Sequence, residues 1–194
     1  MTAFTDFLDL QTAVVEHVQR PDIADVFPRL VKLAEVAFNR RVRCREQVTT
    51  SSLVVTGGVA TLPTDFQEVI GVYDEAGAEY IAQPLQELRK TQSKGYYSIS
   101  GSTLTTKNDE TLTLQYYAKV PTISATMTDS NWLLQKAPGL YLYGVGLEAA
   151  KYVRDAEIAQ ATMPFLEMEF AALAAEDAQQ RYSRARVRMQ GVTP

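Results

Sequence analysis

The hydrophobic pattern of the chain changes its period twice, and this feature constrains the fold more than any other. Up to about residue 45, apolar residues recur with the period of an α-helix. Residues 46–121 are instead rich in β-branched and aromatic residues separated by turn signals. Helical periodicity returns near Asn131 and continues to about residue 184. We therefore predict an α+β protein: a helical bundle formed by the N- and C-terminal helices, with an inserted small antiparallel β-sheet or barrel.

The same changes set the predicted boundaries. We expect residues 1–45 to supply the N-terminal helices of the bundle, residues 46–121 the β-rich insertion, and residues 122–185 the C-terminal helices. Residues 186–194 are predicted to be an extended C-terminal tail, because the chain has no periodicity after Arg184. The length of 194 residues suits one domain, or one domain that carries an insertion.

Capping and breaking residues predict where the helices begin. Thr5 is expected to cap the first helix and Asp22 the second, because a side-chain oxygen at an N-cap accepts a backbone N–H. Pro28, near the start of the second helix, can separate a short leading turn from it. Pro138 is expected to interrupt the next helical segment, and the last helix is predicted to begin near Pro164.

Turn residues divide the insertion into about six strands. Gly57-Gly58 is a signal for a tight hairpin, and Gly101 marks another. Residues 111–120 alternate between apolar and polar side chains, which predicts a long strand with Leu112, Leu114, Tyr116 and Ala118 on one face. Residues 84–91 are predicted to form a short helix.

The net charge of −4 is unevenly distributed. Residues 46–121 carry −4 and residues 122–180 carry −5, whereas residues 181–194 carry +4 and no acidic residue. The acidic body disfavours phosphate binding, which needs positive charge. The basic C-terminal segment suits docking on an acidic surface of a partner protein.

Two further groups of residues have the character of an interface. Arg40, Arg41 and Arg43 crowd the end of the second helix, where they form either a solvated helix end or a contact surface for an anionic partner. Tyrosines occur in adjacent pairs in the insertion, and neighbouring residues of a strand face opposite sides. We predict that Tyr96 and Tyr117 belong to a subunit or tail interface, because exposed Tyr is enriched at interfaces.

Few residues are suited to catalysis or metal binding. The chain has no phosphate-binding loop, nucleophile elbow or zinc motif. It has one Cys and one His, so a nucleophile and its base would have to be Cys44 and His17. Glu169 and Glu176 share a helix face and have the chemistry to hold a hard cation, but a solvated acidic face is the commoner structure. We predict no catalytic residue, no metal and no cofactor.

The chain also has no long apolar stretch and no basic-then-apolar leader, and a single Cys excludes an internal disulfide. From these features we expect a soluble protein, made in a reducing compartment, that does not bind membranes.

Four segments in order carry a resemblance to a known family. They are residues 22–35 with 39–43 (DIADVFPRLVKLAE, NRRVR), 62–69 (LPTDFQEV), 114–121 (LQYYAKVP), and 131–134 with 137–144 (NWLL, APGLYLYG). In this order they resemble the head-to-tail adaptor (connector) proteins of tailed bacteriophages.

The resemblance implies a structural virion protein at the head–tail junction, assembled in the host cytoplasm and without enzymatic activity. It implies a ring of about twelve copies below the portal protein. The helical bundles would form the ring, the insertion would face the downstream tail or nozzle protein, and DNA would cross the lumen without specific binding. The C-terminal segment would reach the portal, with Arg181, Arg184, Arg186 and Arg188 in the portal-binding arm.

Three alternatives stay open from the residues alone. One is a tail-side terminator or stopper protein, a class that usually forms hexamers. Another is a DNA-binding regulator that uses the Arg-rich helix end and the basic tail, and this alternative requires salt-sensitive binding to duplex DNA. The last is an enzyme that uses Cys44 or the acidic cluster.

Overall fold

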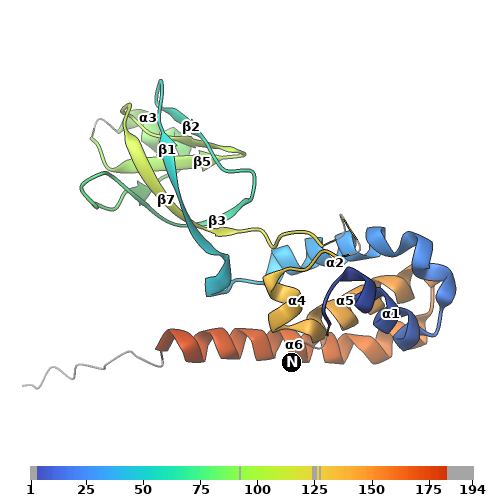
Figure 1. The fold of residues 1–194 in the computed structure, drawn as a ribbon. Coiled ribbons are helices and arrows are strands. Elements are labelled where there is room, and N and C mark those ends of the chain that lie inside the picture. Colours follow the sequence, from blue (N-terminus) through green and yellow to red (C-terminus); the bar gives the residue numbers. More distant parts are fainter. Residues whose placement is uncertain (1–3, 92, 124–125, 127, 183–194) are drawn as a thin grey trace, which may run out of the picture. The chain divides into compact units, whose positions relative to one another are not determined.

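The computed structural model describes residues 4–182 except 92, 124, 125 and 127. The chain forms two compact units, which we name the helical unit and the β unit. The helical unit contains the residues up to Val42 and those from Val120 onward, and the β unit is Arg43–Lys119. The predicted fold class is confirmed: helices from both ends of the chain pack together, and the β-rich segment is inserted between them (Figure 1). The predicted tail, 186–194, lies outside the described residues.

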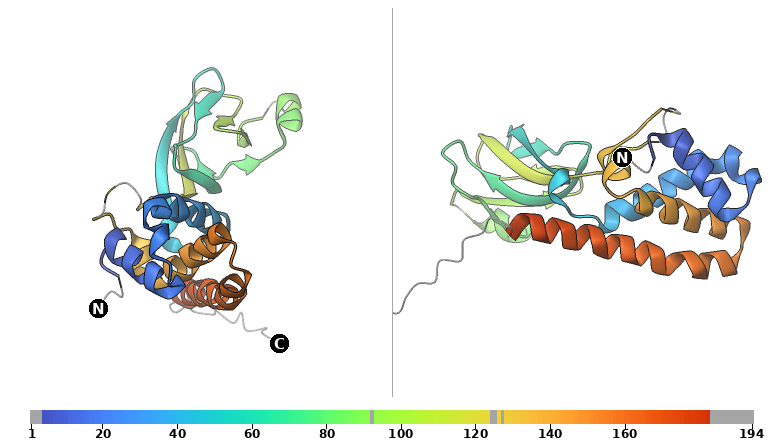
Figure 2. Two further views of the ribbon diagram at one scale, coloured as in Figure 1. Left: turned by 90° about the vertical axis from the view of Figure 1, so that its right-hand side faces the viewer. Right: turned by 60° about the horizontal axis from the view of Figure 1, so that its bottom comes forward.

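The helical unit is built around one buried helix. Its elements are α1 (Phe7–Val18), the 3₁₀ helix η1 (Pro21–Val26), α2 (Phe27–Arg41), α4 (Trp132–Lys136), α5 (Pro138–Val153) and α6 (Ala156–Tyr182). Helix α5 packs against α1, α2 and α6, and α6 runs along the whole helical unit (Figure 2). Pro138 begins α5, so the predicted interruption is confirmed.

Gly144 is required where α5 meets α2. A Cβ at this position would lie 2.5 Å from the Phe38 ring, closer than carbon atoms can approach. The aromatic ring therefore packs directly on the backbone of α5, where it also makes an edge-on contact with the ring of Tyr141.

Both predicted N-caps are wrong. Asp6 caps α1, because its carboxylate accepts the N–H of Asp9 at 3.1 Å, while Thr5 donates its own N–H to the Asp9 carboxylate. Asp22 lies in η1 and α2 begins at Phe27 without a side-chain cap. The Asp22 carboxylate is instead held by the guanidinium of Arg20, with bonds of 2.9 and 2.7 Å.

The last helix also begins earlier than predicted. Asp155 caps it by accepting the N–H groups of Glu157 and Ile158, both at 3.1 Å, and Pro164 lies inside the helix. An internal proline costs about 3 kcal/mol because it removes one helical hydrogen bond. Packing against α5 offsets this cost, since α6 buries side chains on both sides of the proline, among them Leu166.

The β unit contains two small sheets. Its elements are η2 (Arg45–Gln47), β1 (Val48–Val54), β2 (Val59–Thr61), β3 (Phe66–Tyr73), β4 (Ile81–Ala82), α3 (Leu85–Lys90), β5 (Tyr96–Ser100), β6 (Thr103–Thr105) and β7 (Thr111–Ala118). The strand orders are β1-β7-β3 and β2-β6-β5-β4. The sequence predicted about six antiparallel strands; the described residues form seven, and β4 and β5 pair in parallel.

Both predicted hairpin turns are present. Gly101 lies in the turn that joins β5 to β6, which pair across Ser100 and Thr103. Gly57 and Gly58 form a tight turn with positive φ, and Thr56 and Val59 on its two sides exchange both backbone hydrogen bonds, at 3.0 and 3.2 Å. Beyond this bridge, β1 and β2 belong to different sheets. The turn therefore carries the chain from one sheet to the other.

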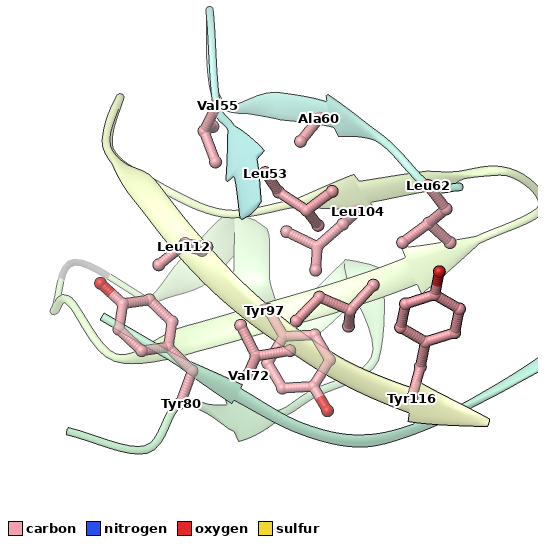
Figure 3. Packing of buried hydrophobic residues seen from close by; sticks show 11 residues of the cluster. Leu53, Val55, Ala60, Leu62, Val72, Tyr80, Tyr97, Leu104, Leu112 and Tyr116 are labelled. Atoms are coloured by element: carbon pink, nitrogen blue, oxygen red, sulfur yellow. The ribbon is translucent and has the colours of Figure 1, made fainter. Parts of the chain in front are cut away.

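Side chains from both sheets meet in one core (Figure 3). The predicted alternation of β7 is confirmed, since Leu112, Leu114 and Tyr116 are all buried in this cluster. The other sheet contributes Tyr97 and Leu104. A core of this size gives the β unit its own hydrophobic stabilisation.

Candidate functional site

An apolar groove lies between helices α2 and α6 in the helical unit. Its volume is about 180 Å³. Helix α5 lines it with Gly144, Leu147 and the ion-paired Glu148 and Lys151. The walls are the apolar side chains Ala34, Ala37, Phe38, Met163, Leu166 and Phe170. Because the groove combines residues from three helices, it exists only in the folded bundle.

One ion pair connects the two walls of the groove. The guanidinium of Arg41 donates to both carboxylate oxygens of Glu167, each at 2.6 Å, and lies 3.8 Å from the centre of the Phe170 ring. The hydrogen bonds from Arg41 hold the pKa of Glu167 below its usual range. A bidentate pair of this kind fixes the direction of both side chains and keeps both charges at the groove.

Large apolar side chains are exposed close to this groove. On α2, Leu33 is 55% exposed one turn before the groove residue Ala37, and on α6 the groove residue Met163 is 50% exposed. Contiguous exposed apolar surface marks interaction sites in soluble proteins. The groove and these side chains are therefore the candidate interaction surface of the helical unit.

The predicted arginine cluster is divided between the two units. Arg40 is exposed on α2, and Arg41 is the groove residue that binds Glu167. Arg43 belongs to the β unit, where its Nε lies 2.6 Å from a carboxylate oxygen of Glu68. Two of the three predicted interface arginines thus have carboxylate partners within their own chain.

The predicted tyrosines are the half-buried members of their pairs. Tyr96 and Tyr117 are each partly exposed, whereas Tyr97 and Tyr116, the other members of the two pairs, are buried. Tyr116 donates its hydroxyl to Asp65 at 2.9 Å, and burial together with this carboxylate raises the pKa of Tyr116 to about 12. Tyr96 and Tyr117 lie on β5 and β7, which belong to different sheets.

The predicted portal-binding arm begins at the end of α6. Arg181 is described, and its Nε lies 2.7 Å from the carboxylate of Asp177 on the preceding turn. Arg184, Arg186 and Arg188 lie outside the described residues.

The residues considered for catalysis or metal binding differ in burial and in partners. Cys44 is buried in the β unit, while His17 is an exposed residue of the helical unit whose ring contacts Tyr143. Glu176 accepts from Gln180 and pairs with Lys136. Within residues 4–182, apart from the four gaps, His, Cys, Asp and Glu do not form a group of three or more suited to a metal ion.

No helix in the described part of the chain has the length and apolar character needed to cross a lipid bilayer.

The sequence does not reveal the groove or one buried carboxylate. The groove residues have the pattern of core positions, and only the fold shows that part of this surface is open. Glu35 is 5% exposed on α2, and its side chain receives hydrogen bonds from Ile123 and Tyr141. Its position between Val31 and Phe38, on the apolar side of the helix, is the signal from which a buried carboxylate is predictable.

Comparison with known proteins covers nearly the whole chain. The sequence profile described as SU10 adaptor protein matches residues 5–190. A search of curated proteins gave no match. The matched family consists of structural phage proteins that act at the head–tail junction and interact with other head and tail proteins. With this match, and with helices from both ends of the chain enclosing a β insertion, the chain belongs to the SU10 adaptor family of bacteriophage head-to-tail adaptors.

Proposed function

We propose that this chain is the repeating subunit of a ring that lies below the portal and joins it to the downstream tail or nozzle protein. About twelve copies form the ring, which matches a dodecameric portal one subunit to one subunit. The observation that carries the proposal is the family match over residues 5–190, together with an apolar groove and exposed apolar side chains on the helical unit. Such a surface suits lateral contact between copies.

The basic C-terminal segment is the proposed contact with the portal. It contains Arg181, Arg184, Arg186 and Arg188 and no acidic residue. The first of these arginines, Arg181, lies in the last turn of α6. Four positive charges in fourteen residues suit an acidic groove on the portal, and electrostatic complementarity would set the docking register.

The lumen of the ring is proposed to pass DNA without binding it. Residues 46–180 are acidic overall, and like charge keeps a conduit from retaining the genome. The interface role of Arg40, Arg41, Arg43, Tyr96 and Tyr117 also stays a proposal. For Arg41 and Arg43 it requires that their intrachain carboxylates be shared with, or exchanged for, groups of a neighbour.

The direct test is the stoichiometry of the complex with the portal. Purified chain is mixed with the portal of the same phage, and the mass of the isolated complex is measured by native mass spectrometry. We expect about twelve copies per portal ring. Six copies, or no binding to the portal combined with binding to a tail tube, would instead favour a terminator or stopper.

A duplex-DNA control accompanies this measurement. We expect no retardation of duplex DNA at physiological salt, because the chain has a net charge of −4. Tight, salt-sensitive DNA binding in place of portal binding would favour the regulatory alternative.

A further inference from the structure

Helix α2 presents a stripe that is both basic and apolar. Arg29, Lys32, Leu33, Val36 and Arg40 are all exposed, and their spacing places them on one side of the helix. Three of these residues, Arg29, Lys32 and Arg40, are positively charged. In the described chain none of the three forms a salt bridge, in contrast to Arg41 on the same helix. We name these five residues the α2 stripe.

Helix α1 presents a stripe of the opposite charge. Leu8, Asp9, Thr12 and Glu16 are exposed on one side of α1, and Leu8 is 52% exposed. Asp9 also accepts the N–H of Thr5, which leaves its negative charge in place. We name these four residues the α1 stripe; it carries two negative charges around one large apolar side chain.

The two stripes lie on helices that pack on different sides of α5. The α1 side of α5 is marked by Tyr143, whose ring is 5.7 Å from the ring of His17. The groove side is marked by Gly144, against the Phe38 ring of α2. Leu33 of the α2 stripe lies one turn before Ala37 in the groove wall, so the stripe begins beside the groove and extends over the face of α2 that turns away from it. Each stripe is therefore exposed in a single copy of the chain.

We propose that the α1 stripe of one copy packs on the α2 stripe of the next copy; this inference rests on the proposed ring. Leu8 would cover Leu33 and Val36, which removes all three side chains from water. The carboxylates of the α1 stripe would then face the cations of the α2 stripe, and complementary charge sets the register of such a contact.

The charges also decide the symmetry of the contact. Two α2 stripes face to face would oppose three cations with three cations, and two α1 stripes would oppose carboxylates with carboxylates, which is unfavourable in both cases. The favoured contact therefore joins two different surfaces. Contacts of this heterologous kind, repeated by rotation, close into rings or continue as filaments, whereas a contact between identical surfaces stops at a dimer.

Engineered cysteines test which surfaces meet. Cys44 is 1% exposed, so a short bismaleimide will react mainly with introduced cysteines. A chain with both Leu8→Cys and Leu33→Cys should give a ladder of covalent multimers, because each copy links to two neighbours. Either single variant alone should stay monomeric, and an equimolar mixture of the two should give dimers. The control pairs Leu33→Cys with Val54→Cys, a 70% exposed position of the β unit, and should give no ladder.

Charge reversal tests the electrostatic part. Arg29→Glu with Lys32→Glu should reduce the ladder of the double-cysteine chain about tenfold or more, and adding Asp9→Lys and Glu16→Lys should restore it. Lys90→Glu, an exposed charge in the β unit, is the matched control and should have no effect. The Leu33→Cys single variant could instead form dimers as abundantly as the double-cysteine chain forms its ladder. That result would overturn the proposal in favour of a two-fold contact between identical surfaces.

The outcomes separate this contact from the proposed function. Cross-linking is carried out on the concentrated free chain and on the chain mixed with the portal. Absence of the ladder from both preparations overturns the contact, even if about twelve copies bind the portal. A ladder in the free chain without any portal binding supports the contact and contradicts the portal-joining role.

Discussion

At the scale of single residues, the helical unit depends on a buried polar cluster around Glu35. One carboxylate oxygen accepts the N–H of Ile123 at 2.9 Å and the hydroxyl of Tyr141 at 3.1 Å. Asn131 donates to the same hydroxyl at 2.6 Å and to the carbonyl of Pro121 at 2.6 Å. The cluster thus joins the middle of α2 to the segment that enters the unit from β7 and to the start of α4.

Removal of the Glu35 carboxylate should destabilise the helical unit. Glu35→Ala leaves the N–H of Ile123 and the hydroxyl of Tyr141 without this acceptor, and we expect a loss of about 1–3 kcal/mol in the free energy of unfolding. Glu35→Gln keeps an acceptor oxygen and should cost less. Trp132, the single tryptophan, lies on α4 and reports on this unit during urea unfolding. Equal stability of wild type and Glu35→Ala would contradict the role of the cluster.

The same carboxylate should make stability depend on pH. Burial raises the pKa of Glu35 above its ordinary value of 4.5, because it disfavours the charged form. The folded state therefore holds this proton more tightly than the unfolded state, and the resulting stabilisation is complete below pH 4.5 and lost as the pH rises through the raised pKa. Relative to Glu35→Gln, the wild type should be less stable at neutral pH than at pH 4.5. The measurement is the difference in urea midpoint between the wild type and Glu35→Gln at each pH. We expect the wild-type midpoint to fall relative to that of the variant as the pH rises, and a relative rise would contradict the prediction.

At the scale of elements, the residues that predict helix ends and strands gave correct predictions where tertiary packing favours the same structure. The break at Pro138 and the alternation of β7 follow from the sequence because both depend on nearby residues. The predictions at Asp22 and Pro164 were wrong. The Asp22 carboxylate binds the neighbouring Arg20 and does not cap a helix. Contacts with α5 stabilise α6 more than Pro164 destabilises it, so the helix does not begin at this proline. The partners of β1 and β2 were not predictable, because both strands pair with distant residues: Val48 of β1 pairs with Tyr117, and Val59 of β2 pairs with Thr105.

The approach of α5 to α2 gives a prediction with a matched control. Gly144→Ala would place a Cβ 2.5 Å from the Phe38 ring, and the overpacking should cost about 1–3 kcal/mol of stability. Gly146→Ala would place its Cβ 3.4 Å from the exposed His17 ring, an ordinary contact distance. The second variant should be neutral or gain up to about 1 kcal/mol from helix propensity. Thermal unfolding followed by the fluorescence of Trp132 compares the stability of the two variants. A similar loss of stability in both would contradict the packing argument.

At the scale of the whole molecule, the distribution of charge was predictable and the groove was not. The acidic middle and the basic end are properties of the sequence itself. The groove depends on which faces of α2, α5 and α6 meet, and residues such as Phe38 and Phe170 have the same pattern in sequence as ordinary core positions. The pairing of Arg41 with Glu167, which are 126 residues apart, likewise follows only from the packing of α2 on α6.

The basic C-terminal segment gives the prediction that concerns the molecule and its partner together. Arg181 is best left intact, because it pairs with Asp177, a carboxylate whose side chain is only 7% exposed. Replacement of Arg184, Arg186 and Arg188 by Gln removes three charges and should weaken portal binding about tenfold or more, whereas Lys at all three positions should retain most of it. Salt screens exposed charges, so the portal affinities of the two variants should become similar as the ionic strength rises from about 0.05 M to about 0.5 M. Portal affinity measured by biolayer interferometry provides the comparison, and unchanged unfolding at Trp132 shows that the helical unit is intact. If the Gln variant binds the portal as tightly as the wild type at low salt, these arginines are not the docking arm, and portal contact must be sought on the described surface of the helical unit.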